Sequence, residues 1–224
     1  MRVVVRIGGS VVASPPNPEI MSKYAGLLRE LKEQRHELVV VVGGGSVARD
    51  FIRIAKDMGL SEFDQDEVAI GVSRLFAQLL AMKLGDLGSG SVPTSVDEAV
   101  QGLNTGKIVV MGGVRPGMTT DAVAAMVAEQ VGAELLVKAT DVDGVFTRDP
   151  KKHPNAKKID ELDFDDLSRL FEENRHKAGI HQILDSKAVK VLERSKVRMV
   201  VVNGFKPTNV LLAVRGERVG TIIG

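Results

Sequence analysis

The sequence has no cysteine among its 224 residues. This absence excludes a disulfide framework, a thiol nucleophile and a cysteine-ligated metal, and it fits a reducing compartment. A signal peptide is also absent, because Arg6 interrupts the apolar run near the N-terminus. No apolar run approaches membrane-spanning length. We therefore expect a cytoplasmic protein that does not act at a membrane.

An excess of charge of one sign is lacking as well. The 30 basic and 29 acidic side chains leave a formal net charge of +1. Such a balance creates no field that would attract nucleic acid or anionic lipid, so any bound anion has to be held by local groups. The length of the chain and its hydrophobic content of 44% fit one α/β domain over residues 1–224.

Two common nucleotide-binding signatures are absent or out of context. The chain has no Walker A pattern, G-x-x-x-x-G-K-[ST], which excludes a P-loop kinase. Gly43, Gly45 and Ala48 formally satisfy the dinucleotide-binding pattern G-x-G-x-x-A. That pattern requires an acidic residue at the end of the next strand, whereas Asp64 and Asp66 open an apolar helix. The sequence therefore argues against dinucleotide binding.

The sequence does contain a series of apolar runs that end in polar or glycine-rich loops. The runs at residues 3–7, 38–42, 108–111 and 135–137 predict buried strands of a mostly parallel sheet. The loops that follow them are Gly8-Gly9-Ser10, Gly43-Gly44-Gly45-Ser46, residues 112–121 and residues 138–150. Ligands of open α/β sheets bind beyond the carboxyl ends of the strands, so these loops form the predicted site.

The glycine loops favour phosphate as the ligand, because a helix N-terminus after such a loop presents free N–H groups to an anion. One predicted helix is capped by Asn17. Another carries Arg49, which could add a fixed positive charge or could be a solvated surface residue. A weak strand at residues 88–93 and a short helix that starts at Ser95 and ends near Gly106 are expected to be structural.

Three charged residues near the predicted site each have a structural explanation besides a functional one. Asp121 and Asp66 stand at predicted helix starts, where an acidic side chain stabilises the helix dipole or caps the first turn. Lys138 follows the strand at residues 135–137, where a lysine is more often solvated. Taken singly, none of the three identifies a function.

The combination of loops is more specific than any one of them. The motifs are Arg6-Ile7-Gly8-Gly9-Ser10, Val42-Gly43-Gly44-Gly45, Pro116-Gly117-x-Thr119-Thr120-Asp121 and Asp143-Gly144-Val145-Phe146-Thr147-x-Asp149-Pro150. Together they resemble the amino acid kinase superfamily, and within it the archaeal-type UMP kinases. The resemblance covers essentially the whole chain, through Ile183-Leu184-Asp185-x-Lys187-Ala188 and a strand at residues 197–202 to the terminal Gly220-Thr221-Ile222-Ile223.

This resemblance implies an α/β fold, a three-layer αβα sandwich with a mostly parallel central sheet. It also implies transfer of the γ-phosphoryl group of ATP to UMP in pyrimidine biosynthesis, with Mg²⁺ accompanying ATP, by a homohexamer. The expected catalytic residues are Arg6, Asp121 and Lys138, with Asp121 between the phosphates. The expected ATP-binding residues are Gly8, Gly9, Ser10, Gly45, Arg49, Thr140, Phe146 and Asp149. The expected UMP-binding residues are Gly44, Asp66, Val114, Arg115, Pro116, Gly117, Met118, Thr119 and Thr120.

Two residues depart from the family pattern. Arg6 stands where many members have lysine, which keeps the charge but changes its geometry and hydration, so either Arg6 or Lys138 could be the phosphoryl clamp. Phe146 stands where tyrosine is also common, so an apolar contact is kept and a hydroxyl contact is lost. A sister kinase acting on a carboxylate, carbamate or isopentenyl phosphate acceptor and a non-catalytic relative stay open as alternatives.

Overall fold

The computed structural model describes residues 1–173 and 184–224, and its centre is a sheet of parallel strands. Within these residues the sheet has the strand order β3-β2-β1-β4-β8-β9-β7. The strands are β1 (Arg2–Ile7), β2 (Glu37–Val42), β3 (Val109–Met111), β4 (Leu135–Thr140), β7 (Glu161–Leu162), β8 (Met199–Asn203) and β9 (Thr221–Ile223). Neighbouring strands are parallel except for the β8–β9 pair, which is antiparallel. The expected mostly parallel sheet is confirmed.

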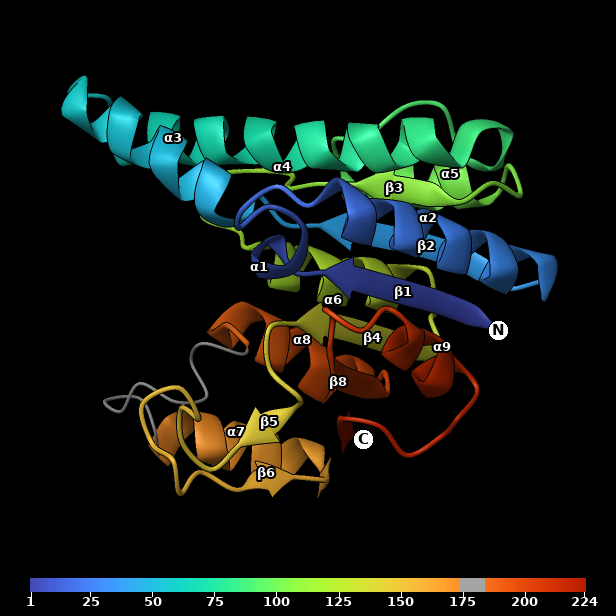
Figure 1. The fold of residues 1–224 in the computed structure, drawn as a ribbon, viewed down its shortest axis with the longest axis vertical. Coiled ribbons are helices and arrows are strands. Elements are labelled where there is room, and N and C mark those ends of the chain that lie inside the picture. The colour runs from blue at the N-terminus through green and yellow to red at the C-terminus, as the bar shows by residue number, and fades with distance from the viewer. Residues whose placement is uncertain (174–183) are drawn as a thin grey trace.

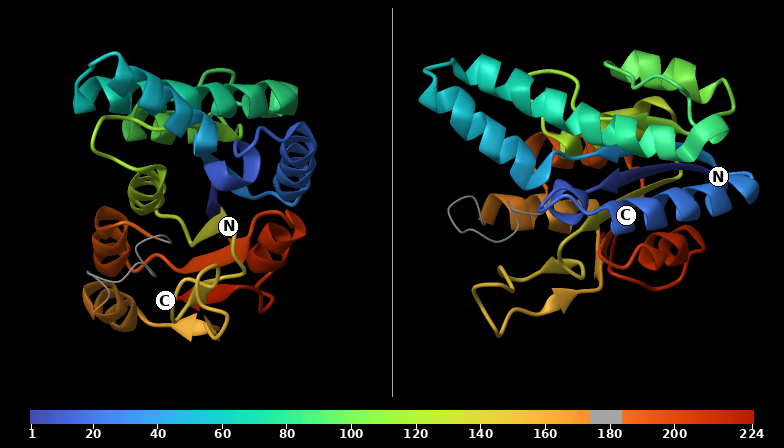
Figure 2. Two further views of the ribbon diagram at one scale, coloured as in Figure 1. Left: turned by 60° about the vertical axis from the view of Figure 1, so that its left-hand side comes forward. Right: turned by 45° about the horizontal axis from the view of Figure 1, so that its top comes forward.

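Helices cover both faces of the sheet, as Figures 1 and 2 show. The helices are α1 (Gly9–Val12), α2 (Pro18–Glu33), α3 (Gly45–Asp57), α4 (Glu62–Leu84), α5 (Val96–Leu103), α6 (Thr120–Gln130), α7 (Phe164–Glu173), α8 (Ser186–Ser195) and α9 (Thr208–Val214). A 3-10 turn (Gly85–Leu87) follows α4, and β5 (Val145–Phe146) pairs with β6 (Lys158–Ile159) in a separate antiparallel ribbon. One core lies under α1, α2, α4 and α9, and the other lies under α5, α6, α7 and α8. The three-layer αβα sandwich is therefore confirmed.

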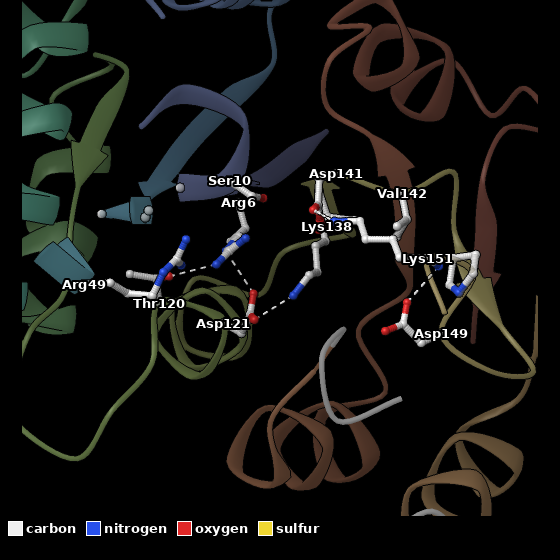
Figure 3. A pocket seen from close by; sticks show the side chains of 16 residues that line it. Arg6, Ser10, Arg49, Thr120, Asp121, Lys138, Asp141, Val142, Asp149 and Lys151 are labelled. Atoms are coloured by element: carbon white, nitrogen blue, oxygen red, sulfur yellow. Dashed lines mark hydrogen bonds and ion pairs between the residues drawn. The ribbon is translucent and has the colours of Figure 1, made fainter. Parts of the chain in front are cut away.

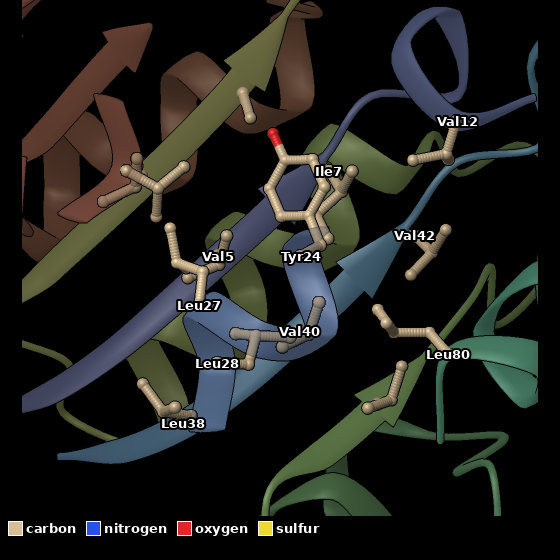
Figure 4. Packing of buried hydrophobic residues seen from close by; sticks show 14 of the residues in the cluster. Val5, Ile7, Val12, Tyr24, Leu27, Leu28, Leu38, Val40, Val42 and Leu80 are labelled. Carbon is tan, nitrogen blue, oxygen red and sulfur yellow. The ribbon is translucent and has the colours of Figure 1, made fainter. Parts of the chain in front are cut away.

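The alternation of side chains along β1 decides which residues face which layer. Val5 and Ile7 point into the core under α2, where Tyr24 and Leu28 pack against them (Figure 4). Arg6 lies between Val5 and Ile7, so its side chain points to the opposite face, which α6 covers. Because side chains alternate between the two faces of the strand, the charged side chain of Arg6 points towards the start of α6.

Most local predictions are confirmed, and three are corrected. α2 begins after Asn17, whose side chain accepts the N–H of Ile20 at 2.9 Å. Residues 88–93 do not form a strand, because Gly88 makes only an isolated bridge to Ile108. The short helix α5 ends at Leu103, before the expected Gly106, and β4 continues past the apolar run as far as Thr140. Ile183 lies outside the described residues.

The helix α4 corrects a further expectation. The segment Glu62–Leu87 is long and apolar enough to cross a membrane by length and composition, so the expectation that no segment approaches this length is wrong. One side of α4 is part of the core, with Phe76 and Leu80 buried. Its other side exposes apolar residues. The large apolar side chains exposed on α3, α4 and their connection, here called the α3–α4 apolar face, are Phe51, Ile54, Met58, Leu60, Phe63, Leu75, Leu79 and Met82.

Candidate functional site

Two glycine turns meet at the carboxyl ends of β1 and β2. A Cβ atom placed on Gly9 would lie 2.1 Å from the backbone nitrogen of Gly45, so only glycine allows this approach. Gly9 is the first residue of α1 and Gly45 the first residue of α3. The N-termini of α1 and α3 are therefore in close contact at the carboxyl ends of these two strands. The structure thus places together the two glycine turns from which the sequence predicted a phosphate cradle, and phosphate binding there stays a prediction.

The main cleft, of about 370 Å³, opens above this junction. It is lined by Arg6, Gly9, Ser10, Gly43, Gly44, Gly45, Arg49, Thr120, Asp121, Lys138, Thr140, Asp141, Val142, Asp149, Pro150 and Lys151. All three expected catalytic residues are among them. Of the expected ATP-binding residues, Gly8 and Phe146 are not part of the lining. Gly8 instead supports the floor, because its N–H donates to the carbonyl of Ala139 at 2.8 Å.

The charged centre of the cleft is the carboxylate of Asp121, which lies between two cations (Figure 3). The Nε atom of Arg6 is 2.9 Å from Oδ1 of Asp121, and Nζ of Lys138 is 2.6 Å from Oδ2. Arg6 also donates to the hydroxyl of Thr120 at 3.1 Å. Two fixed cations and one carboxylate are thus concentrated at the mouth of the glycine cradle.

The electrostatics of this centre follow from its burial. Burial disfavours ionisation of Asp121, but the charges of Arg6 and Lys138 outweigh it and hold the pKa of Asp121 below its usual value. Burial, together with the charge of Arg6, lowers the pKa of Lys138 to about 8, although Asp121 partly opposes this shift. Asp121 is consequently a carboxylate at neutral pH, and Lys138 carries its charge at neutral pH and loses it as the pH rises through about 8.

The position of Lys138 corrects the view of it as a solvated residue at the end of a strand. Lys138 lies inside β4, and its side chain is only 2% exposed. Asp121 also does more than stabilise a helix start, because it pairs with both cations, while Thr119 caps α6 by accepting the N–H of Ala122 at 3.1 Å. Solvation therefore does not describe Lys138, and stabilisation of the helix dipole does not account for all the contacts of Asp121.

Sequence reasoning left some lining residues out of the site. Asp141 and Lys151 form an ion pair at the far end of the cleft. Asp149, which is buried, accepts the N–H of Lys151 at 2.9 Å. The signal for Asp141 was its place directly after Thr140, at the end of the strand. Lys151 follows Asp149-Pro150, but nothing in the sequence indicates that it folds back on Asp141.

A second, smaller groove of about 150 Å³ adjoins the main cleft. It is lined by Gly44, Ala48, Asp66, Ala69, Ile70, Ser73, Gly113, Arg115, Met118, Thr119 and Thr120. Gly44 and Thr120 line both spaces. Of the residues expected at UMP, Val114, Pro116 and Gly117 lie on the same loop but outside the lining. Ala48, Ala69, Ile70, Ser73 and Gly113 line the groove and were missed, because small and apolar residues carry no chemical signal in a sequence.

Asp66 does not cap the helix that carries it. The cap of α4 is Ser61, which forms a reciprocal capping box with Asp64. Asp66 lies a turn further on, and its Oδ2 atom accepts the N–H of Gly117 at 2.7 Å. The capping explanation is therefore wrong. Asp66 instead links α4 to the loop at residues 114–119.

The site contains carboxylates but no cage for a metal ion. In residues 1–173 and 184–224 no group of three or more histidine or acidic side chains is arranged to hold one. Mg²⁺ usually takes one or two carboxylate oxygens together with substrate phosphates and water. Asp121 and Asp141 are carboxylates that line the cleft and fit this kind of binding. The donor set is suited to an ion that arrives with a phosphate ligand.

The fold and the site together define an α/β sandwich in which two glycine turns at helix N-termini lie in one cleft with the side chains of Arg6, Lys138 and Asp121. Comparison with known proteins identifies the family. Residues 1–203 match the model of the amino acid kinase family. The uridylate kinase of Methanocaldococcus jannaschii is 44% identical over 225 residues, covering 100% of this chain and 99% of that protein. The uridylate kinase of Methanothermobacter thermautotrophicus is 41% identical, with the same coverage. The chain belongs to the amino acid kinase family.

Solved structures agree with this assignment. The crystal structure of uridylate kinase from Archaeoglobus fulgidus superimposes with a TM-score of 0.90 at 37% identity, over 100% of both chains. The UMP kinase of Bacillus anthracis matches with a TM-score of 0.81 at 23% identity, covering 100% of this chain and 95% of the other. The second likeness supports the fold alone.

Proposed function

We propose that this chain is a uridylate kinase, which transfers the γ-phosphoryl group of ATP to UMP and yields ADP and UDP. The observation that carries the proposal is the position of Asp121, held between Arg6 and Lys138 beside the two residues that line both grooves. The full-length similarity to uridylate kinases supports UMP as the acceptor. The same similarity argues against the carboxylate, carbamate and isopentenyl phosphate kinases as alternatives.

The main cleft is assigned to ATP. Its phosphates would lie against the Gly9 and Gly45 turns, which line the cleft at the starts of α1 and α3. The nucleoside would extend towards Thr140 and Asp149 at the other end. Arg49, whose charge also lines the cleft, adds to the neutralisation of the phosphates. We assign Phe146 a supporting role only, because it lies outside the lining.

The smaller groove is assigned to UMP. Asp66 offers a carboxylate to the ribose hydroxyls, and the loop at residues 114–119 with Thr120 encloses the acceptor phosphate. Gly44 and Thr120 belong to both spaces, so a phosphate in the small groove meets the end of a phosphate chain in the main cleft. In-line transfer needs this proximity more than it needs covalent chemistry from the protein.

At the junction, Arg6 and Lys138 would neutralise the phosphoryl group during transfer, when its charge is spread over the peripheral oxygens. Asp121 would hold the two cations at the spacing given by its two oxygens. When bound, Mg²⁺ would neutralise part of the charge of the ATP phosphates. The carboxylates of the cleft lining that would hold it or its water ligands are those of Asp121, Asp141 and Asp149.

We also propose a domain organisation, an oligomeric state and a cellular location for the protein. We propose that residues 1–224 act as one kinase domain, because β1 and β4 supply cations to a junction that both grooves share. We propose that the α3–α4 apolar face is an interface between copies of the chain, because its exposed apolar side chains gather on neighbouring helices. The resemblance to UMP kinases makes the proposed assembly a homohexamer. A cytoplasmic location agrees with the lack of cysteine and with nucleotide substrates.

The function is tested by measuring ADP release with ATP and Mg²⁺ over a panel of acceptors: UMP, CMP, AMP, a carboxylate, carbamate and isopentenyl phosphate. We expect release with UMP to exceed that with every other acceptor. The proposal is overturned if UMP releases no more ADP than buffer while another acceptor turns over.

The proposed assembly is tested by measuring the mass of the protein in solution by light scattering. We expect a hexamer for the native protein and smaller species for Leu79→Glu.

A further inference from the structure

The loop at residues 114–119, here called the acceptor loop, is held from both sides of the sheet. On one side Asp66 of α4 accepts the N–H of Gly117 at 2.7 Å. On the other side Nζ of Lys187, in the first turn of α8, donates to the carbonyl of the same glycine. Gly117 has a φ of +71°, a left-handed conformation that glycine adopts without strain. One residue thus connects α4 and α8, which pack on opposite faces of the sheet.

The second connection between α8 and the loop runs through Asp185. Its Oδ1 atom caps α8 by accepting the N–H groups of Lys187 and Ala188 at 2.8 and 3.0 Å. Its Oδ2 atom accepts the hydroxyl of Thr119. The Thr119 hydroxyl in turn caps α6 by accepting the N–H of Ala122. The caps of α6 and α8 are therefore joined through a single carboxylate.

This linkage ends at Thr119, next to two residues of the site. The residues directly after Thr119 are Thr120, which lines both grooves, and Asp121, which pairs with the two cations. Neither Asp185 nor Lys187 lines either groove. The two residues therefore act on the site through the loop and not by contact with a substrate.

We infer that Asp185 and Lys187 are positioning residues, which hold the acceptor loop and the start of α6 in the conformation that binds the acceptor phosphate. The inference rests on the assignment of the smaller groove to UMP. Lys187 is exposed, and an exposed hydrogen bond contributes little to global stability. Its loss should therefore appear as weaker binding of UMP, while ATP, which lies mainly on the glycine turns, is bound as before.

The test uses the full chain with three variants and one matched control. Lys187→Met removes the donor to Gly117 and keeps a side chain of similar length. Lys187→Arg keeps a donor and tests rescue. Asp185→Ser keeps an oxygen that can cap α8 and removes the oxygen that accepts the Thr119 hydroxyl. The control is Lys190→Met, because Lys190 is also exposed on α8 and, among the residues that the structure describes, no hydrogen bond or ion pair joins it to the loop.

We expect Lys187→Met and Asp185→Ser to raise the KM for UMP at least about fivefold, which corresponds to about 1 kcal/mol, the typical net contribution of one hydrogen bond. The KM for ATP should change less than about twofold, and Lys187→Arg should recover most of the loss. Hydrogen exchange of the unliganded protein should become faster at the amides of residues 114–119 in both variants. Lys190→Met should match the native protein in all of these measurements.

Equal rises in both KM values would overturn the inference, as would behaviour of Lys187→Met identical to that of Lys190→Met. The exchange measurement needs no substrate, so it separates the inference from the proposed function. If the native protein does not phosphorylate UMP, the function fails. The positioning of the loop is then refuted only if exchange at residues 114–119 is the same in Lys187→Met and the native protein.

Discussion

Arg6 and Lys138 are paired in register on the adjacent parallel strands β1 and β4, and both side chains reach the carboxylate of Asp121. Their neighbours Val5, Ile7, Val137 and Ala139 face the opposite core. The register therefore brings two cations side by side on the face that α6 covers, and the first turn of α6 supplies the carboxylate that holds them.

The first prediction concerns Arg6. We expect Arg6→Ala to lower kcat by about two orders of magnitude or more and to change KM less, because the guanidinium acts mainly on charge that develops in the transition state. Steady-state kinetics with UMP and ATP measure the effect. Arg53→Ala, which removes an exposed arginine of α3, is the control and should retain native kcat. If Arg6→Ala keeps the native kcat, Lys138 and not Arg6 is the phosphoryl clamp.

The second prediction follows from the pKa of Lys138, which is lowered to about 8. The ammonium group is present below this pH and is lost as the pH rises through it. The kcat/KM for ATP should therefore fall above about pH 8, because this ratio reports the titration of the free enzyme. In Lys138→Arg, the side chain stays charged and this descending limb should disappear. If kcat/KM still falls above about pH 8 in Lys138→Arg, the group that titrates there is not Lys138.

The third prediction concerns the stability that Asp121 supplies. Asp121→Asn leaves two nearby cations without their carboxylate, so we expect it to cost about 3 kcal/mol of unfolding free energy at neutral pH. Because the folded-state pKa of Asp121 lies below 3.8, its contribution is present above that pH and is lost as the pH falls through the folded value. Denaturant titrations at pH 7 and pH 3 should show the difference from the native protein shrinking. A constant difference would mean that packing, and not charge, stabilises the site.

The variant Asp121→Asn should also lose activity while staying folded. We expect kcat to fall, because Arg6 and Lys138 are no longer held at a fixed spacing. Circular dichroism establishes that the fold is kept, and single-turnover rates measure the chemical step. Native turnover would reduce Asp121 to a structural residue at the start of α6.

The fourth prediction separates the two grooves. Asp66→Ala should weaken UMP binding at least about tenfold, since a charged acceptor of hydroxyl hydrogen bonds contributes about 1.5–3 kcal/mol for each bond. The affinity for ATP should stay the same. Ser61→Ala, which removes the true cap of α4, should do the opposite, lowering the melting temperature and leaving both affinities unchanged. Titration calorimetry and a thermal melt of both variants provide the comparison.

The sequence predicted the sheet and the glycine cradle well, because buried parallel strands and strand–glycine–helix junctions have strong local patterns. It predicted less well what depends on contacts between distant segments. The burial of Lys138 depends on α6 covering β4. The position of Asp66 depends on a hydrogen bond from the N–H of Gly117, 51 residues further along the chain. The helical spacing of apolar residues in α3 does not say which surface covers them, and Phe51 and Ile54 are exposed in the single chain.

Gly44 and Thr120 line both grooves, so with ATP and UMP in the grooves proposed for them, the binding of one substrate would affect the binding of the other. Two polyanions would meet at a place where the fixed side chains Arg6, Lys138 and Asp121 sum to a single positive charge. Each substrate should therefore disfavour the other until further positive charge arrives, and the penalty must be the same in either order of addition, because coupling between two binding equilibria is reciprocal. A divalent cation would thus act on the cooperativity between the two substrates as well as on the rate of transfer.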